Sequence, residues 1–305
     1  MKEIQLSSFA VKMKWERPVV YSFNPPFPGN LEISLNSTCN HQCIFCPCYK
    51  PRKNLHEKAI VMPKDKAFDL IGQAYNLGVR DIGFISYSEP LLYKNLEDCV
   101  AYARDLGYTY VYLTTNGSLA DRDRLSKLFT GTGNGGLHSL RFSVNAGNRE
   151  TYKNIHGRDD FDTVINNIVT ANELRNELKL DIPLFVSFVE TPLNKGQWNL
   201  LEKKLKNIVD RLYVFPARNN GGYLQEELQS GIVEPVKTVK PLMCPQPFNR
   251  FQITPEGYLT TCCVDADNSM VVADLNKVSL KDAWYCDNML KVRSYFLDQA
   301  IPTNS

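Results

Sequence analysis

Short apolar runs recur along the first two thirds of this 305-residue chain, and each is rich in β-branched and aromatic residues. Turn residues bound the runs on both sides, which is the pattern of buried β-strands. The expected strands cover residues 31–35, 81–86, 108–115, 139–145, 182–189 and 211–215.

Between these runs, the apolar residues take the spacing of amphipathic helices. The clearest stripe runs from Ala67 to Leu77, where Gly78 would end the helix, and others cover 96–106, 164–178 and 198–208. Alternating strands and helices give parallel strands joined by crossovers, and six units indicate a partial (β/α)6 barrel in the α/β class. We expect chemistry at the carboxyl ends of its strands.

The strand–helix rhythm ends near residue 216. Residues 251–263 read as a hairpin whose turn is Pro255-Glu256-Gly257, and a helix is expected from an N-cap at Ser279 to Phe296. We therefore expect an irregular lead (1–30), the barrel (31–217), a linker (218–240) and a separate small α+β module (241–305).

Composition narrows the class of protein. An apolar fraction of 43% and a charged fraction of 22% are ordinary for a soluble globular domain. The net charge of +2 gives no case for a nucleic-acid or membrane-surface partner. No window approaches the roughly 18 apolar residues of a spanning helix, and the first residues lack the apolar core of a signal peptide. We expect a cytoplasmic protein.

Four of the nine cysteines stand within ten positions, in the stretch CNHQCIFCPC at 39–48. An odd count and a reducing compartment argue against a disulfide framework. Cys39, Cys43 and Cys46 follow the first strand with the spacing C-x3-C-x2-C. Three thiolates from one loop can hold three irons of a four-iron cluster and leave the fourth open to a cofactor or substrate.

Other uses of these thiols stay open at this point. A zinc site needs a fourth ligand, which His41 or Cys48 would supply. Chance clustering of cysteines without any ligand is a further alternative. If the loop holds iron, Cys48 is expected to be a spectator, because it follows Pro47 outside the three-cysteine spacing.

The cysteine loop carries Phe45 before its last cysteine, and EPLL (89–92) and TNG (115–117) follow the second and third strands. Over residues 30–215 this order resembles the radical S-adenosylmethionine (radical SAM) superfamily. The resemblance implies a [4Fe–4S] cluster on Cys39, Cys43 and Cys46 whose open iron binds SAM. It also implies a reduced flavodoxin or ferredoxin-type electron donor, cleavage of SAM to a 5′-deoxyadenosyl radical, and hydrogen abstraction from a substrate.

The same resemblance places Phe45 near the SAM adenine. Family members usually carry Gly-Gly-Glu-Pro after the second strand, where this chain has Tyr87-Ser88-Glu89-Pro90. Glycine permits close backbone approach, so the local geometry differs here. Ser88 and Glu89 are then expected to receive the SAM amino group. The alternative for Glu89 is an acid at a helix N-terminus with no ligand.

Three polar residues further along match SAM-binding positions of the family. Ser143 and Asn145, at the end of the fourth strand, match positions used for the ribose or carboxylate, and Arg158 resembles an arginine used for the carboxylate. The alternatives are loop capping and a solvated charge. Asn116-Gly117 is expected to be a plain turn with a positive-φ glycine.

The C-terminal region also contains cysteines at a recognisable spacing. Cys244, Gly257 and Cys262, with twelve and four residues between them, resemble the start of a SPASM or twitch extension. That implies an auxiliary iron–sulfur cluster on Cys244 and Cys262. The family pattern continues with further cysteines, whereas only Cys286 follows Cys263 here. Neighbours in a strand face opposite sides, so one of Cys262 and Cys263 is expected to be buried.

The remaining candidates have ordinary explanations. Cys99 falls on the apolar stripe of a helix and reads as core. Three histidines show no metal-site or triad spacing and are expected in loop or surface roles: His56, His138 and His156.

The leading hypothesis is a radical SAM enzyme acting on a peptide, a protein or a sugar-like small molecule. The short stretch before the first strand disfavours a peptide maturase with its own leader-binding domain. An iron–sulfur electron-transfer or scaffold protein with a degenerate SAM site is the alternative, because the glycines before Glu89 are replaced. A zinc-stabilised binding protein is a third. Fold and cofactor do not choose the substrate.

Overall fold

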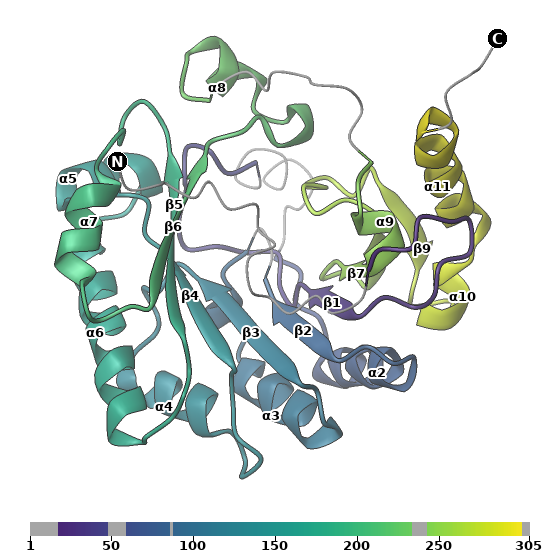
Figure 1. Cartoon of the computed structure of the whole chain (residues 1–305), viewed down its shortest axis with the longest axis horizontal. Coiled ribbons are helices and arrows are strands. Elements are labelled where there is room, and N and C mark those ends of the chain that lie inside the picture. Colours follow the sequence, from purple (N-terminus) through teal and green to yellow (C-terminus); the bar gives the residue numbers. More distant parts are fainter. Residues whose placement is uncertain (1–17, 48–58, 86–87, 234–242, 301–305) are drawn as a thin grey trace.

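The computed structural model describes residues 18–47, 59–85, 88–233 and 243–300. The described strands form one sheet in the order β6-β5-β4-β3-β2-β1-β7-β8-β9. Its first six strands are parallel neighbours that curve into an open barrel (Figure 1). They are β1 (Asn30–Ile33), β2 (Asp81–Phe84), β3 (Tyr110–Thr115), β4 (Ser139–Ser143), β5 (Leu184–Glu190) and β6 (Arg211–Pro216). All six predicted strands are confirmed, as is the partial-barrel fold class.

Helices cover the outside of these strands (Figure 1). They are α2 (Lys64–Asn76), α3 (Leu96–Leu106), α4 (Arg122–Thr130), α5 (Arg149–His156), α6 (Phe161–Glu177) and α7 (Trp198–Leu205). The sequence pattern predicted the other four but not α4 and α5. Those two have only nine and eight residues and few apolar positions, so no stripe stands out.

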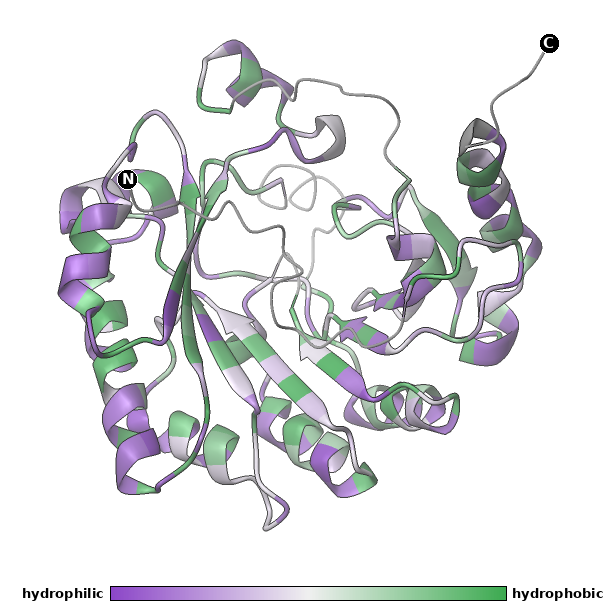
Figure 2. Ribbon diagram, in the orientation of Figure 1, coloured by the Kyte–Doolittle hydropathy of each residue, from purple (hydrophilic) through white to green (hydrophobic). Residues whose placement is uncertain are grey.

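Side chains alternate between the two faces of each strand. Leu31 and Ile33 of β1 pack in the core under the helices, whereas Glu32 between them lies on the opposite face. Along β3 and β4 hydropathy alternates in the same way (Figure 2). The inner face of the barrel is therefore polar while its outer face is apolar.

A buried polar group spans this inner face. Glu32 Oε1 accepts hydrogen bonds from Tyr112 Oη, 3.1 Å away, and from Arg250 Nη1, 2.7 Å away. The Tyr112 ring crosses over Gly83 of β2, where a Cβ would lie 2.3 Å from a ring carbon. Only glycine leaves room for the ring at that position.

The C-terminal region continues the same sheet. It contains α9 (Gln246–Asn249), β7 (Arg250–Ile253), β8 (Tyr258–Thr260), β9 (Val271–Asp274), α10 (Leu280–Trp284) and α11 (Asp287–Ala300). The predicted hairpin is confirmed, since β7 and β8 pair antiparallel. However, β7 also pairs in parallel with β1, so the hairpin extends the barrel sheet and is not a structurally separate unit. Sequence patterns do not reveal parallel pairing between such distant segments.

One further expectation for this half of the chain is corrected. The helix expected from Ser279 to Phe296 is two helices, interrupted at Tyr285 and Cys286. Trp284 Nε1 and Tyr285 Oη both donate to the carbonyl of Pro25, which fixes the chain at the interruption. The linker boundaries stay a prediction, and within its described residues, 218–233, the chain forms η2 (Asn220–Gly222) and α8 (Gln225–Gln229).

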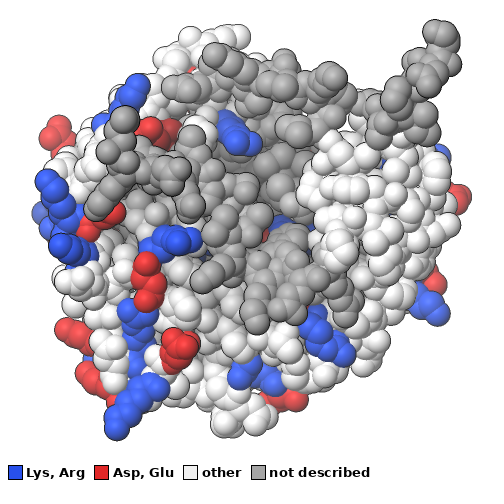
Figure 3. Space-filling model, in the orientation of Figure 1, with Lys and Arg blue, Asp and Glu red and all other residues white. Residues whose placement is uncertain are grey.

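The surface of the described residues carries charges of both signs. On the face in Figure 3, Lys and Arg side chains are interspersed with Asp and Glu side chains along the left and lower parts of the molecule. Among the helices that the structure describes, none has the length and apolar character needed to cross a membrane.

Replacing Gly83 tests the packing of the inner face. The methyl of Gly83→Ala would overlap the Tyr112 ring, and overpacking of this kind costs about 1–3 kcal/mol of unfolding free energy. Urea denaturation measures the loss. Gly72→Ala on α2 is the control, because its nearest neighbour is the hydroxyl of Tyr102 at 3.3 Å and alanine favours a helix. Equal stability of the two variants would contradict this packing.

Candidate functional site

The three-cysteine loop follows β1 and crosses the carboxyl end of the barrel (Figure 1). Its first residues are tied to the loop after β2. Glu89 N donates to the carbonyl of Thr38 at 2.9 Å, and Asn36 Nδ2 donates to the carbonyl of Glu89 at 3.1 Å. The neighbouring Ser88 is partly exposed at the same place. Two segments that the sequence assigned to one site are thus adjacent.

The carboxylate of Glu89 is buried, and both of its oxygens accept hydrogen bonds from other groups of the protein. Oε1 accepts from Leu91 N at 3.0 Å and from Thr115 Oγ1 at 2.6 Å, while Oε2 accepts from Asn116 N at 2.7 Å. Burial raises the pKa of Glu89, and these hydrogen bonds oppose the rise. Glu89 therefore caps the short helix η1 (Pro90–Leu92) and joins it to the end of β3.

Asn116 connects this carboxylate to the cysteine loop. Its Nδ2 lies 2.8 Å from Asn40 Oδ1 and 3.9 Å from Cys39 Sγ, and the residue is buried. The expected turn is present, with Gly117 at φ 79°. Sequence reasoning missed the contact with Cys39, although the position of TNG directly after a barrel strand was a signal for it.

The other side of the cysteine loop rests on the end of α5. Gln42 N donates to the carbonyl of His156 at 2.9 Å, and Ile44 N donates to the carbonyl of Ile155 at 3.0 Å. Gly157 then turns the chain away at φ 66°, where a Cβ would lie 3.1 Å from the Cβ of Gln42. These backbone contacts set the path of the loop between Cys39 and Cys46.

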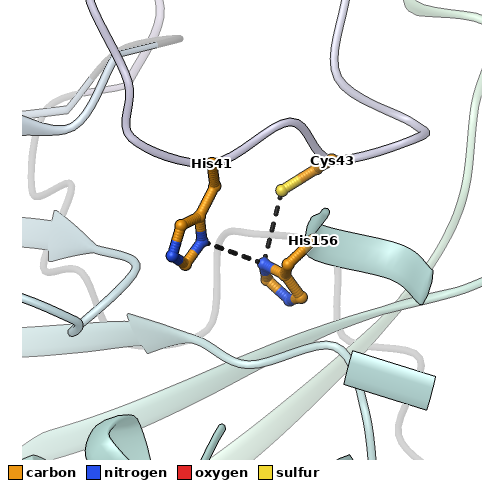
Figure 4. Close-up of side chains that lie close together, drawn as sticks. All are labelled: His41, Cys43 and His156. Carbon is orange, nitrogen blue, oxygen red and sulfur yellow. Dashed lines mark hydrogen bonds between the residues drawn. The ribbon is translucent and has the colours of Figure 1, made fainter. Parts of the chain in front are cut away.

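Two buried histidines meet Cys43 in this region (Figure 4). The Nδ1 of His156 lies 3.2 Å from the Nδ1 of His41 and 3.3 Å from Cys43 Sγ. Burial lowers the pKa of His156 to about 3, with a contribution from the charge of His41. Burial also lowers the pKa of His41, although Asp160 opposes it. The expected loop or surface role for His156 is wrong, because packing across the fold brings together residues that are 113 positions apart.

The thiols of the loop suit a metal cluster. Burial raises the pKa of Cys43 well above its usual value, and the charges of Cys46 and Cys39 raise it further. Cys39 is exposed, but the loops around its sulfur still desolvate it and raise its pKa to about 12. The three sulfurs are thus close enough to oppose each other's ionisation. A bound cluster would displace the thiol protons, so this donor set fits [4Fe–4S].

Phe45 lies between the last two cysteines of the loop. Its carbonyl accepts a hydrogen bond from Asn220 Nδ2 at 3.2 Å. Helix η2, which follows the last barrel strand, therefore holds the cysteine loop. The ring of Phe45 packs on a small apolar cluster formed by Ala217, Leu224 and Val233. The expected contact with adenine stays a prediction.

Three other predicted SAM residues have different surroundings. Ser143 Oγ lies 3.2 Å from Ser187 Oγ on the inner face of the barrel. The amide of Asn145 is engaged within the protein, since its Oδ1 accepts from Val189 N at 2.7 Å. Arg158 is exposed. Burial is the main cause that lowers the pKa of His41, and the positive charge of Arg158 lowers it further. Contacts of the three with SAM stay predictions.

Three of the C-terminal cysteines lie near one another. Burial raises the pKa of Cys262, and the charge of Cys244 adds to it; both thiols also raise the pKa of Cys263. Cys262 and Cys263 follow the end of β8, where Cys262 is partly exposed and Cys263 is exposed, so neither is fully buried as expected for one of them. Cys286 donates its thiol to a carbonyl of β9 at 3.5 Å.

The remaining candidates have structural roles or lie outside the described residues. Cys99 is buried on α3, as predicted. His138 Nδ1 accepts from Val111 N at 2.9 Å, and its Nε2 contacts Arg104. His56 and Cys48 belong to the part of the chain that the structure does not describe.

Glu89→Gln tests the buried carboxylate. The amide of glutamine replaces one carboxylate oxygen, which accepts a hydrogen bond, with an NH2 group, which cannot. The donor that loses its acceptor is then buried without a partner, which costs about 1–3 kcal/mol. We expect the free energy of unfolding of the metal-free chain to fall by that amount in urea denaturation. Glu150→Gln, an exposed change in the first turn of α5, should stay within about 0.5 kcal/mol of the wild type. A variant as stable as this control would show that the hydrogen bonds do not hold the loops.

His138 should make stability depend on pH. Burial, and then the charge of Arg104, lower the pKa of His138 from its usual value of 6.5 to about 4. Between these values the unfolded chain binds the proton and the folded chain does not, so the free energy of unfolding falls as the pH falls through that window. Denaturation at a series of pH values should show a shallower fall for His138→Gln and an unchanged one for the exposed Asn134→Gln. Equal slopes for all three chains would contradict this assignment.

Comparison with known proteins agrees with this geometry. The family model for the radical SAM superfamily matches residues 33–186, and the SPASM model, an iron–sulfur cluster-binding domain, matches residues 244–303. A probable GTP 3′,8-cyclase of Saccharolobus islandicus is 27% identical over 278 residues, with 81% of this chain and 87% of that protein covered.

Solved structures show the same fold at low identity. Streptococcus suis SuiB bound to its precursor peptide SuiA matches with a TM-score of 0.69 at 16% identity, over 89% of this chain and 68% of SuiB. BtrN in complex with AdoMet and 2-DOIA matches with a TM-score of 0.57 at 18% identity, over 91% and 90%. The matched domains make the protein an enzyme that depends on [4Fe–4S] clusters and SAM. The chain therefore belongs to the radical SAM superfamily and carries a SPASM iron–sulfur domain.

Proposed function

We propose that Cys39, Cys43 and Cys46 hold the cluster with which this enzyme cleaves SAM reductively. The resulting 5′-deoxyadenosyl radical would take a hydrogen atom from a peptide, a protein or a sugar-like small molecule. The observation that carries the proposal is the loop of three thiols at the carboxyl end of β1, held on one side by Asn116 and on the other by α5. Active sites of β/α barrels occupy this end of the sheet.

The chain itself binds and orients the reactants. When bound, the cluster supplies a low-potential electron and one iron position that is open to SAM. Backbone hydrogen bonds fix the loop before the cluster arrives, and the sulfurs of Cys39 and Cys43 have polar neighbours in Asn116 and His156. Such outer contacts orient ligands and tune a metal centre.

The proposal divides the expected SAM contacts into two groups. Ser88, Ser143 and Arg158 are at least partly exposed and would contact SAM directly. The carboxylate of Glu89 and the amide of Asn145 already have partners in the chain, which supports a positioning role for them. Phe45 would border the adenine from a loop held by η2.

The inner face of the barrel supports a polar substrate. Arg141, Tyr110 and Ser187 lie on that face, and the Arg141 guanidinium stands 5.2 Å from the centre of the Tyr213 ring. Hydroxyl and guanidinium groups suit either a peptide backbone or a sugar-like molecule. The similar proteins include one named as a GTP cyclase and one that was solved with a bound precursor peptide. A small molecule and a peptide thus both occur in the names of similar proteins. We further propose a cytoplasmic location and reduction by a flavodoxin or ferredoxin-type donor.

Cluster loss is the expected result of Cys43→Ala, because it removes one of three ligands. After anaerobic reconstitution with iron and sulfide, the variant should lack the [4Fe–4S] signal at Cys39 and Cys46 and form no 5′-deoxyadenosine from SAM and dithionite. Cys286→Ala is the control, since that thiol contacts a carbonyl of β9 instead. An active Cys43→Ala variant would refute the proposed ligand set.

The second candidate is an iron–sulfur electron-transfer or scaffold protein with a degenerate SAM site. It is favoured by the internal hydrogen bonds of Glu89, a residue expected to bind SAM. The same reconstitution separates the two functions. A cluster that is reduced reversibly without cleavage of SAM would support this candidate and refute the proposed reaction.

A further inference from the structure

Three metal-binding atoms converge beside the cluster loop. The Nδ1 atoms of His41 and His156 are 3.2 Å apart, Cys43 Sγ lies 3.3 Å from the latter, and all three donor atoms lie within 4.8 Å of one another (Figure 4). In a tetrahedral zinc site, bonds of about 2.0 Å to nitrogen and 2.3 Å to sulfur put two nitrogens about 3.3 Å apart and nitrogen and sulfur about 3.5 Å apart. The two distances to His156 Nδ1 differ from these values by a few tenths of an ångström, and the donor atoms of His41 and Cys43 lie within 4.8 Å of each other.

The Nε2 atoms of both rings, on the side away from Cys43, have hydrogen-bond partners that are typical of metal-ligating histidines. His41 Nε2 lies 3.1 Å from Asp160 Oδ2, and His156 Nε2 lies 2.7 Å from the carbonyl oxygen of Val144. Metal-bound histidines regularly donate their second N–H to a carboxylate or a backbone carbonyl. Asp160 stands at the N-cap of α6 yet makes no capping hydrogen bond with its side chain. It faces His41 instead.

The Nδ1 sides of the two rings face each other and the thiol. The two Nδ1 atoms are 3.2 Å apart, and that of His156 is 3.3 Å from Cys43 Sγ (Figure 4). Both histidines are buried. The Nε2 of His156 also lies 3.3 Å from Asn145 Nδ2, so the protein holds this ring at its far nitrogen and leaves Nδ1 toward Cys43.

From this geometry we infer that His41, Cys43 and His156 form a binding site for one divalent ion of the zinc class. Nitrogen and sulfur ligands suit such an ion, and three protein ligands leave a fourth position for water. Binding releases the thiol proton of Cys43, because the thiolate is the ligand. The Tyr152 ring stacks on His156 at a centroid distance of 4.0 Å and holds it in place.

The ion and the iron–sulfur cluster exclude each other, since both need the thiolate of Cys43. This step rests on the proposed cluster ligands, whereas the ion site itself does not. The cluster loop thus has two metal states, and zinc bound to the metal-free chain blocks assembly of the cluster. Selection between the two follows the supply of zinc and of iron and sulfide.

X-ray absorption of the zinc-loaded, cluster-free chain tests the site directly. The triple variant Cys244→Ser/Cys262→Ser/Cys263→Ser keeps zinc from these C-terminal thiols, and one equivalent of Zn²⁺ is added. Two imidazole nitrogens and one sulfur in the first shell are expected. Zinc surrounded by three sulfurs, which would be Cys39, Cys43 and Cys46, overturns the inference.

Cobalt binding gives a second measurement with matched variants. Co²⁺ in this background should show thiolate-to-metal charge transfer and tetrahedral bands. His156→Gln should weaken its binding at least tenfold, whereas His138→Gln should leave affinity and spectrum unchanged. Circular dichroism checks that each variant is folded. Equal cobalt affinity in the wild type, His41→Gln and His156→Gln overturns the site.

Reconstitution then tests the exclusion. One equivalent of Zn²⁺ added before iron and sulfide should lower the yield of cluster at the three-cysteine loop at least tenfold, and His41→Gln should restore it. An equal yield with and without zinc refutes the exclusion. A zinc-free chain that forms no cluster at all would instead refute the proposed cluster ligands, while the absorption and cobalt results would still decide the ion site.

Discussion

The carboxylate of Glu89 fixes the loops at the mouth of the barrel relative to one another. It is buried, and its two oxygens collect hydrogen bonds from its own helix, from Thr115 and from Asn116. Its backbone N–H bonds to Thr38 at the start of the cysteine loop. One residue therefore joins the ends of β1, β2 and β3, and burial makes each missing partner costly. The position of Cys39 depends on this arrangement through Asn116.

The end of α5 provides the opposite support. Its last two carbonyls accept from Gln42 and Ile44, so the loop between the cysteines is held on both sides by protein that does not itself bind iron. A loop fixed in this way loses little conformational freedom when ligands bind. The same packing brings His41 and His156 against Cys43. The support of the loop by α5 and the proximity of these three side chains thus have the same structural cause.

Local patterns predicted the strands well because each strand buries one apolar face, and the three-cysteine loop was recognised from spacing within eight residues. Features that depend on distant pairing were not predictable. His156 looked isolated because its partner Cys43 is 113 residues away. The role of Glu89 in joining loops follows from partners on β3 that only the folded sheet supplies. Spacing within one segment indicates candidate ligands, but folding decides which segments meet.

The junction between barrel and SPASM domain also depends on such distant pairing. Strand β1 would be an open sheet edge without β7, and edge strands are normally covered or paired. The pairing carries Arg250 into the barrel, where its guanidinium meets Glu32, and both are buried. Neither charge is tolerated there alone, because an unpaired buried charge costs about 3–5 kcal/mol. The C-terminal hairpin is therefore part of the barrel wall, and the cysteines that follow it in sequence are placed by the same sheet that places the three-cysteine loop.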